Sequence, residues 1–284
     1  MEKLLEQAGA CAFGCVAVEK LRSHMSEAAW QRAQETTPGL RSLICAAFPY
    51  GPEVCAPGRV SLYARGADYH QVLRARLEPV AEELARRHPG CRFDYYADVS
   101  PFPEVYAAAL AGLGRLGQNG LLITEKAGSF VFLGFLATDA DLPVTGGEIV
   151  PCRGCGACRK ACPGKALRDD VGIVPYGALL QERCLSAITQ MRGDLTAEQA
   201  ELVKRGGMLW GCDRCQLVCP ENQNRRVFAL PEFEPQPDPA EEDVLLSDRQ
   251  FRRIFAGRAF TWRGVQPFRR NHEILKEDAP CKES

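Results

Sequence analysis

Long apolar runs and an excess of charge of either sign are both missing from this sequence. No stretch approaches the roughly 18 consecutive apolar residues that a membrane-spanning helix needs, which argues against an integral membrane protein. Lysine and arginine total 35 against 36 acidic residues, so the formal net charge of −1 gives no global attraction for a polyanion. Any nucleic-acid partner must therefore be recognised by a local patch.

An apolar export signal is missing as well. Glu2, Glu6 and Gln7 interrupt the N-terminal stretch in which a secretory signal places an apolar segment of about 7–15 residues. Cysteine, by contrast, is abundant, at 14 of 284 residues. In a reducing cytoplasm, clustered cysteines serve as metal ligands or catalytic thiols before they form disulfides. We therefore expect a cytoplasmic protein whose clustered cysteines carry chemistry.

Eight of these cysteines follow a recognisable spacing. The first run is Cys152-x2-Cys155-x2-Cys158-x3-Cys162-Pro, and the second is Cys212-x2-Cys215-x3-Cys219-Pro. The first run is the bacterial ferredoxin pattern, in which three close thiolates hold one [4Fe–4S] cluster and the fourth ligates a second cluster. Two clusters need eight thiolates, and Cys184, the only cysteine between the runs, is the candidate for the eighth.

This spacing predicts two ligand sets. Cluster 1 is assigned to Cys152, Cys155, Cys158 and Cys219, and cluster 2 to Cys162, Cys184, Cys212 and Cys215. The alternative is zinc, because CxxC pairs also build zinc ribbons and knuckles. A CxxCxxCxxxCP run followed by a second CP run favours iron–sulfur clusters.

The remaining sequence indicates an α+β fold. We expect a mixed α/β domain over residues 1–148, a double-cluster ferredoxin-like domain over 149–228, and an acidic linker with an arginine-rich segment over 229–284. In the first domain, apolar runs and helical spacing predict strands at 43–48, 93–98, 121–124 and 130–137 and helices at 69–87 and 103–113. Seven acids and three prolines in 232–248 predict a linker or a segment that wraps the surface.

Residues 251–270 have the opposite charge. They hold six arginines and no acid, interleaved with aromatic residues. These arginines are Arg252, Arg253, Arg258, Arg263, Arg269 and Arg270. Arginine with interleaved aromatics suits phosphate contact and base stacking, as in single-stranded nucleic-acid binding. The alternative is an amphipathic helix that packs its aromatics on the core, and both interpretations stay open here.

Several motifs, taken in order, resemble one protein family. They are Ser61-Leu-Tyr-Ala-Arg-Gly-Ala-Asp-Tyr-His70, Asp98-x2-Pro101, Ala111-Gly-Leu-Gly114, Gly128-Ser129, the first cysteine run, Arg183-Cys184-Leu-Ser186 and Gly211-Cys212-Asp-x-Cys215-Gln-x-Val-Cys219. From the N-terminus to about residue 275 the chain resembles the epoxyqueuosine reductases, which are cobalamin- and iron–sulfur-dependent enzymes of queuosine biosynthesis on tRNA. The chain stops where these enzymes continue into helical repeats, so it resembles a shortened member.

The resemblance implies a site and a mechanism. Asp98, at the matching position, would donate a proton, and a buried carboxyl with a raised pKa could do so at neutral pH. Residues 1–148 would supply most of a cobalamin pocket, with Tyr63, Asp68, His70, Gly114 and Gly117 as candidate contacts. His70 has a simpler interpretation as a histidine beside Asp68 at a helix N-terminus.

The resemblance also implies partners and leaves the substrate open. A flavodoxin or ferredoxin would supply electrons, no membrane is involved, and tRNA would bind through the six arginines. The same cofactors could instead reduce a different small molecule, in the manner of a reductive dehalogenase. A third possibility is an electron-transfer protein without catalysis, although such a protein needs no large domain before its clusters.

Overall fold

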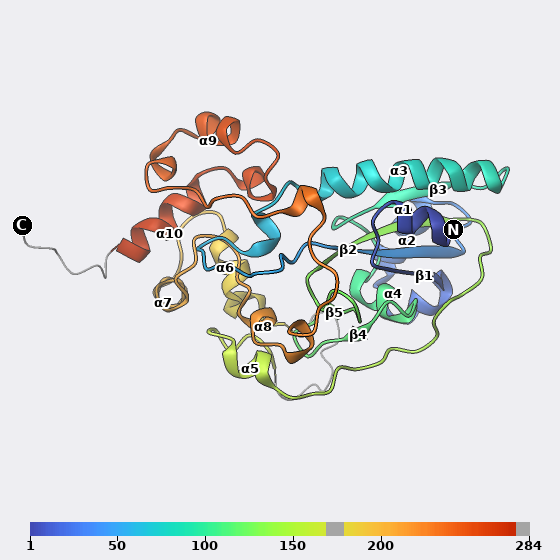
Figure 1. The fold of residues 1–284 in the computed structure, drawn as a ribbon, viewed down its shortest axis with the longest axis horizontal. Helices are drawn as coiled ribbons and strands as arrows, with labels where there is room; N and C mark the ends of the chain where they lie inside the picture. The colour runs from blue at the N-terminus through green and yellow to red at the C-terminus, as the bar shows by residue number, and fades with distance from the viewer. Residues whose placement is uncertain (169–178, 277–284) are drawn as a thin grey trace, which may run out of the picture.

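The structure is a computed structural model that describes residues 1–168 and 179–276 (Figure 1). Its centre is a four-stranded sheet in the order β1-β2-β6-β3, in which every neighbouring pair is antiparallel. The strands are β1 (Ala12–Ala17), β2 (Ser42–Pro49), β6 (Val131–Thr138) and β3 (Phe93–Tyr96). In the described residues, no helix is long and apolar enough to cross a membrane.

Strand β2 is buried along its whole length because helices cover both faces of the sheet. Leu43 and Cys45 point to one face, while Ile44 and Phe48 point to the other. A strand buried on both faces reads as an unbroken apolar run, which is how the strand at 43–48 was predicted. That prediction is confirmed.

Different helices cover the two faces of the sheet. Helix α3 (Tyr69–Arg87) lies along one face and buries Leu73, Leu77 and Leu84 against it, as its helical spacing predicts. Helix α1 (Glu2–Gln7) packs beside it, while α2 (Glu27–Thr36) and α4 (Glu104–Leu110) cover the other face. The helix predicted at 103–113 is shorter because Gly112, at φ 83°, turns the chain.

Strand predictions were right for the long strands and poorer for the short ones. The predicted strand at 121–124 is only the two-residue β5 (Leu122–Ile123), which pairs with β4 (Arg115–Leu116) in a separate hairpin. Strand β1 was not predicted at all. Its pairing with β2 is set by tertiary contact rather than by a strong local pattern.

The second half is built from short helices around the cysteines. They are α5 (Ala157–Ala161), α6 (Leu185–Gln190), α7 (Ala197–Gly206), α8 (Arg214–Leu217), α9 (Asp248–Ile254) and α10 (Gln266–Lys276). Short 3₁₀ helices of three to seven residues lie along both halves, at η1 (Val18–His24), η2 (Leu62–Ala64), η3 (Gln181–Arg183), η4 (Pro220–Asn222), η5 (Pro231–Phe233), η6 (Asp243–Leu245) and η7 (Ala259–Arg263). Helices this short are marginal alone, so packing must hold them.

The acidic segment wraps the first half of the molecule instead of linking two bodies. The backbone of Leu230 donates to Pro49, and Ala67 donates to Glu232. Arg65, a buried residue, pairs with Asp238 at 3.4 Å. Of the two possibilities that the sequence left, the structure therefore favours the wrapping segment.

Three of the six arginines assigned to tRNA are used inside the protein, which corrects that prediction. Arg258 is buried and donates to the carbonyl of Ala64. Arg269 donates to the carbonyl oxygens of Val244 and Leu246. Arg270 donates to the carbonyls at the end of α6, from Ile188 to Gly193.

The aromatics of the same segment pack as the second interpretation expected. Phe251, Phe260 and Phe268 are fully buried and surround Trp210, which stacks on Phe268 at 5.2 Å. Arg252 and Arg253 are exposed, and Arg263 is partly so. Trp262 is 53% exposed and lies under the Arg263 guanidinium at 3.8 Å. Only this part of the segment is available to a partner.

A substitution at Arg270 tests whether this arginine has a structural role inside the protein. Arg270→Ala would leave the carbonyls at the end of α6 without their donor, and hydrogen bonds from a charged group contribute about 1.5–3 kcal/mol each. We expect the free energy of unfolding of the anaerobic protein, measured in urea, to fall by about 2–3 kcal/mol. Arg252→Ala removes an exposed ion pair with Asp248 and a 3.3 Å hydrogen bond to the Trp262 carbonyl, and it should lower the free energy of unfolding by about 1 kcal/mol or less. Equal effects would mean that Arg270 has no such role.

Candidate active site

The eight spaced cysteines lie in two adjacent groups. The charges of Cys152, Cys155 and Cys219 act on Cys158. Those of Cys162, Cys184 and Cys212 act on Cys215, as does that of Cys158 in the neighbouring group. The structure thus brings together the same two sets of four that the spacing predicts.

The thiols of the second group suit a cationic cluster. Burial, assisted by the charges of Asp213 and Cys184, raises the pKa of Cys212 to about 11, and burial with neighbouring thiolates raises the pKa of Cys215 further. A cysteine binds metal as the thiolate, so cluster binding at this group would displace the protons of these thiols. Among the described residues, no three His, Cys, Asp or Glu side chains form a site for a single metal ion. Eight thiols in two groups of four match the number of ligands that two [4Fe–4S] clusters need.

A glycine turn and a buried carboxylate fix the second cysteine loop to the first half of the chain. Gly211 has φ 72°, and a Cβ there would collide with the side chain of Ser61. Asp213 accepts hydrogen bonds from the Ser61 hydroxyl and, at 2.8 Å, from the Leu62 backbone. The cysteine loop therefore lies directly beneath the Ser61–His70 motif.

A cavity of about 470 Å³ lies between the sheet and the second cysteine group. Tyr50, Tyr63, Val131 and Phe132 form its wall from the first half. The opposite wall includes all four cysteines of the second group: Cys162, Cys184, Cys212 and Cys215. Its lining is mostly apolar, and because all four cysteines line it, the cavity includes the space that a cluster on this group would occupy. Residues of the cysteine-bearing half form the larger share of these walls.

Beside this cavity, His70 bridges two carboxylates that are distant in sequence. Asp68 caps helix α3, and its Oδ1 lies 2.7 Å from Nδ1 of His70. Nε2 of His70 lies 3.2 Å from Oδ2 of Asp98. Hydrogen bonds from His70 to Asp68 and then to Asp98 raise the pKa of His70 to about 9. His70 is thus an imidazolium at neutral pH, held between two carboxylates.

Asp98 differs from the expectation of a buried acid. It has φ 60° on the loop between β3 and α4, and its side chain is 56% exposed. The hydrogen bond from His70 lowers the pKa of Asp98 below its ordinary value, more than burial raises it. The expectation of a raised pKa is therefore wrong, and in this arrangement the proton lies on His70.

An aromatic layer connects this pair to the cavity. The Tyr69 ring stacks on His70 at 4.0 Å and on Phe132 at 4.4 Å. Phe132 forms part of the cavity wall. The His70–Asp98 pair is therefore one aromatic side chain away from the cavity. Tyr69 was missed as a site residue, although it stands inside the Ser61–His70 motif.

Glu104 was also missed. It lies in the first turn of α4 and accepts a hydrogen bond from the Ser100 hydroxyl at 2.7 Å. Burial, with a smaller effect from the charge of Asp98, raises the pKa of Glu104 to about 7. The sequence signal was available: an acid that opens an apolar, alanine-rich helix is more buried than its type suggests.

Of the other predicted cobalamin contacts, Tyr63 lies at the cavity, whereas Gly114 and Gly117 do not. Tyr63 lines the cavity, and its hydroxyl accepts a hydrogen bond from Trp210 at 2.8 Å. Gly114 and Gly117 do not line it. A Cβ at Gly114 would collide with the carbonyl oxygen of Ile123, so this glycine lets the β4–β5 hairpin close.

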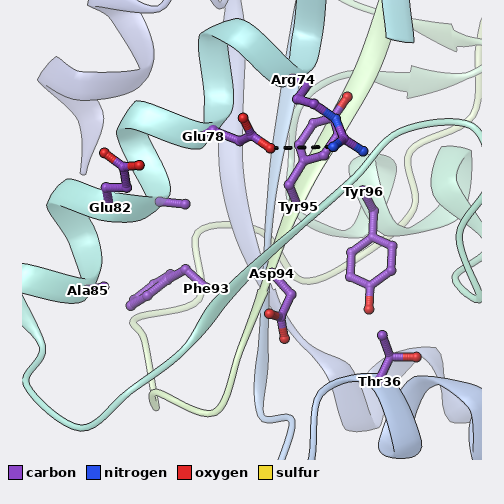
Figure 2. A pocket seen from close by; sticks show the side chains of 10 residues that line it. Thr36, Arg74, Glu78, Glu82, Ala85, Phe93, Asp94, Tyr95 and Tyr96 are labelled. Atoms are coloured by element: carbon purple, nitrogen blue, oxygen red, sulfur yellow. Dashed lines mark ion pairs between the residues drawn. The ribbon is translucent and has the colours of Figure 1, made fainter. Parts of the chain in front are cut away.

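Two outer grooves run between α3 and the edge strand β3. The first, of about 530 Å³, is lined by Arg74, Glu78, Glu82, Asp94 and Tyr95, and Figure 2 shows the Arg74–Glu78 ion pair over the Tyr95 ring. The second, of about 600 Å³, adjoins it and reaches Asp68 and His70. Carboxylates outnumber cations in the first groove, so it is a poor phosphate site. The second groove gives a solvent-side approach to the His70–Asp98 pair.

Comparisons with known proteins match the same two parts of the chain, the first half and the cysteine-bearing half. The family profile "Epoxyqueuosine reductase QueG, DUF1730" matches residues 31–99, and "4Fe-4S double cluster binding domain" matches residues 151–222. An epoxyqueuosine reductase of Lactococcus garvieae is 38% identical over 218 residues, which is 75% of this chain but only 60% of the relative. One of Gloeobacter violaceus is 35% identical over 251 residues, which covers 84% of this chain and 76% of the relative.

A solved structure gives a similar result. It is an epoxyqueuosine reductase with an epoxyqueuosine-modified tRNA-Tyr stem loop, and it is 27% identical to this chain. The match has a TM-score of 0.76 and covers 97% of this chain and 80% of that one. The α+β fold with a double-cluster domain is therefore that of these enzymes.

Cys184 offers a test of the second cysteine group. Cys184→Ala leaves three thiolates in that group, so iron and acid-labile sulfide should fall from about eight to about four atoms per chain in anaerobically purified protein. Cys91→Ala, which alters a cysteine outside both groups, should keep the full content. Loss of all iron from Cys184→Ala, or of none, would contradict the assignment.

The His70 bridge can be tested by titration. Removing the Asp98 charge should lower the pKa of His70 from about 9 towards its ordinary 6.5, because one of its two hydrogen-bonded carboxylates is lost. The measurement is a pH titration of the histidine ring signals by NMR in the parent and in Asp98→Asn. Only four histidines are present, which simplifies assignment. An unchanged His70 titration would rule out the bridge.

Proposed function

Because this chain belongs to the epoxyqueuosine reductase family, we propose that it reduces epoxyqueuosine to queuosine in tRNA. One observation carries the proposal. A largely apolar cavity touches the second cysteine group on one side and, through Phe132 and Tyr69, adjoins the His70–Asp98 pair on the other. The groups proposed to supply electrons and protons thus flank one cavity.

We assign the cofactors to the sites described above. The first cysteine group would hold one [4Fe–4S] cluster and the second group the other. Cobalamin would lie in the cavity, against Tyr63 and Phe132 and beside the second group. When bound, the clusters supply single electrons and reduced cobalamin supplies a nucleophilic metal centre.

Side chains of this protein would hold and transfer the protons that the reaction consumes. Converting an epoxide to an alkene takes up two electrons and two protons and releases one water molecule. His70 holds a proton at Nε2, where Asp98 can receive it and carry it to the substrate oxygen. Asp98 stands on a loop and is more than half exposed, so it can reach the substrate. Glu104, bonded through Ser100 to the same loop, is placed to hold the second proton.

The tRNA would approach from the side of α9. The backbone of Asp68 donates to Gly257 at 2.6 Å, so the turn after α9 touches the start of α3. Exposed Arg252 and Arg253, with Trp262 and Arg263, lie on this segment. Cations beside an exposed aromatic suit phosphate contact and base stacking. A cytoplasmic location is part of the proposal, because tRNA is modified there.

One observation favours a second candidate function. With Arg258, Arg269 and Arg270 bound internally, few cations are left to hold a polyanion. The same site could then reduce a smaller epoxide or another molecule with a leaving group. Transfer of electrons alone is disfavoured, since it needs neither the cavity nor the His70–Asp98 pair.

The proposal is tested by turnover of an epoxyqueuosine-containing tRNA anticodon stem-loop, followed by mass spectrometry of the nucleosides. With both cofactors loaded, the parent should form queuosine at a rate that falls as the pH rises through about 9, where His70 loses its proton. Asp98→Ala should reduce the rate by about 100-fold or more while cluster and cobalamin spectra persist.

Asp94→Asn provides a matched control. This variant removes a carboxylate in the neighbouring groove. The Asp94 carboxylate contacts Thr37 rather than His70, so the variant should keep most of the parent's rate. If the loaded parent leaves the stem-loop unreduced but reduces a small epoxide, the second candidate function replaces the first.

A further inference from the structure

The two cysteine groups differ in their access to solvent. The second group lines the cavity described above, and Cys162 in it is buried. In the first group, Cys155 is exposed and the other three are partly exposed. None of the first group lines that cavity. Electrons that arrive from another molecule would therefore meet the first group before the second.

The surface around the first group is basic. Residues 151–165 carry Arg153, Arg159, Lys160 and Lys165 and no acid, although the whole chain has a net charge of −1. Lys160 and Lys165 are exposed and adjacent, since Nζ of Lys165 donates to the carbonyl of Lys160 at 3.4 Å. Arg153 pairs with Glu221 at 3.1 Å on the neighbouring loop. Lys165 shares a groove with Glu182 and Glu198, whereas no acid lies within the 151–165 segment itself. Exposed cations on this segment can steer an anionic partner.

Exposed apolar side chains accompany these cations. Val150, Leu217 and Val218 are 49%, 48% and 38% exposed. Each lies within two residues of Cys152 or Cys219, and α5 and α8, which follow or precede these cysteines, pack against each other. Transient protein–protein contacts commonly combine a small apolar centre with a charged rim. Exposed cations and exposed apolar side chains thus both lie close in sequence to cysteines of the first group, on segments joined by the packing of α5 against α8.

We propose that this face, formed by Val150, Leu217 and Val218 with Lys160 and Lys165 at its rim, docks a small acidic electron-transfer protein. The inference rests on the proposed function, which needs two electrons per substrate. In each encounter one electron leaves the reduced carrier, which becomes oxidised, and enters the first cluster, with no bond made or broken. Two such transfers balance one epoxide reduction.

The position of this face favours a protein carrier over the tRNA. Figure 1 shows α5 and α8 along the lower side of the molecule and α3 and α9 along the upper side. The tRNA is proposed to bind near α9 and the start of α3, so both partners can bind at once. Contacts between electron-transfer partners are small and weak, which suits a patch of this size.

The test uses anaerobically purified protein with both clusters and an acidic flavodoxin as the probe. In the variant Lys160→Glu/Lys165→Glu, reduction of the clusters by flavodoxin hydroquinone, followed by stopped-flow absorbance, should be at least about tenfold slower at low salt. Flavodoxin affinity, measured by calorimetry, should fall in parallel. Leu217→Ser should weaken binding without changing the salt dependence, because it removes apolar contact only.

Lys3→Glu/Lys20→Glu is the matched control. It makes the same change of net charge at exposed positions in the N-terminal part of the chain and should leave both measurements unchanged. Reduced methyl viologen, a small cation, should reduce the Lys160→Glu/Lys165→Glu protein no more slowly than the parent.

The outcomes separate this inference from the proposed function. Equal flavodoxin rates in parent and variant would overturn the docking face, and so would a parent that methyl viologen reduces but flavodoxin does not. Neither result bears on stem-loop turnover driven by methyl viologen. Conversely, a charge-dependent flavodoxin rate would support the face even if the stem-loop were not a substrate.

Discussion

The active-site geometry depends on a buried polar network that joins the cysteine loops to the first half of the chain. Asp213, between two cysteines of the second group, accepts hydrogen bonds from Ser61 and Leu62. Gln216 bonds Tyr50 and Ser129, and Asn222 bonds Ser129 from the following turn. A buried polar group without a partner costs about 1–3 kcal/mol, so each contact fixes the loop against the sheet. The cavity keeps its shape because its two walls are tied together in this way.

The parts of the molecule that the sequence predicted well are those encoded by local spacing. The cysteine runs, helix α3 and the long strands all carry a pattern within a few residues. The His70–Asp98 contact could not be predicted in this way, because it joins positions 28 residues apart across a helix and a loop. The prediction that all six arginines would contact tRNA was wrong for a related reason. A charged residue looks the same in sequence whether it meets solvent or, like Arg270, a helix end.

The same distinction explains the error about Asp98. The sequence shows an acid after an apolar strand, which suggests burial and a raised pKa. In the folded chain a helix cap brings His70 to it, and a nearby cation outweighs partial burial. The position of the proton therefore depends on three side chains together: Asp68, His70 and Asp98. A single carboxyl with an unusual environment is not required.

The wrapping acidic segment also joins positions that are far apart in the chain. Asp238 caps the backbone of Arg59, 179 residues earlier, and neutralises the buried Arg65. Closing so long a loop is entropically unfavourable until the intervening residues are compact. Arg65 therefore gains its paired carboxylate only when residues far apart in the chain are held together by the folded body.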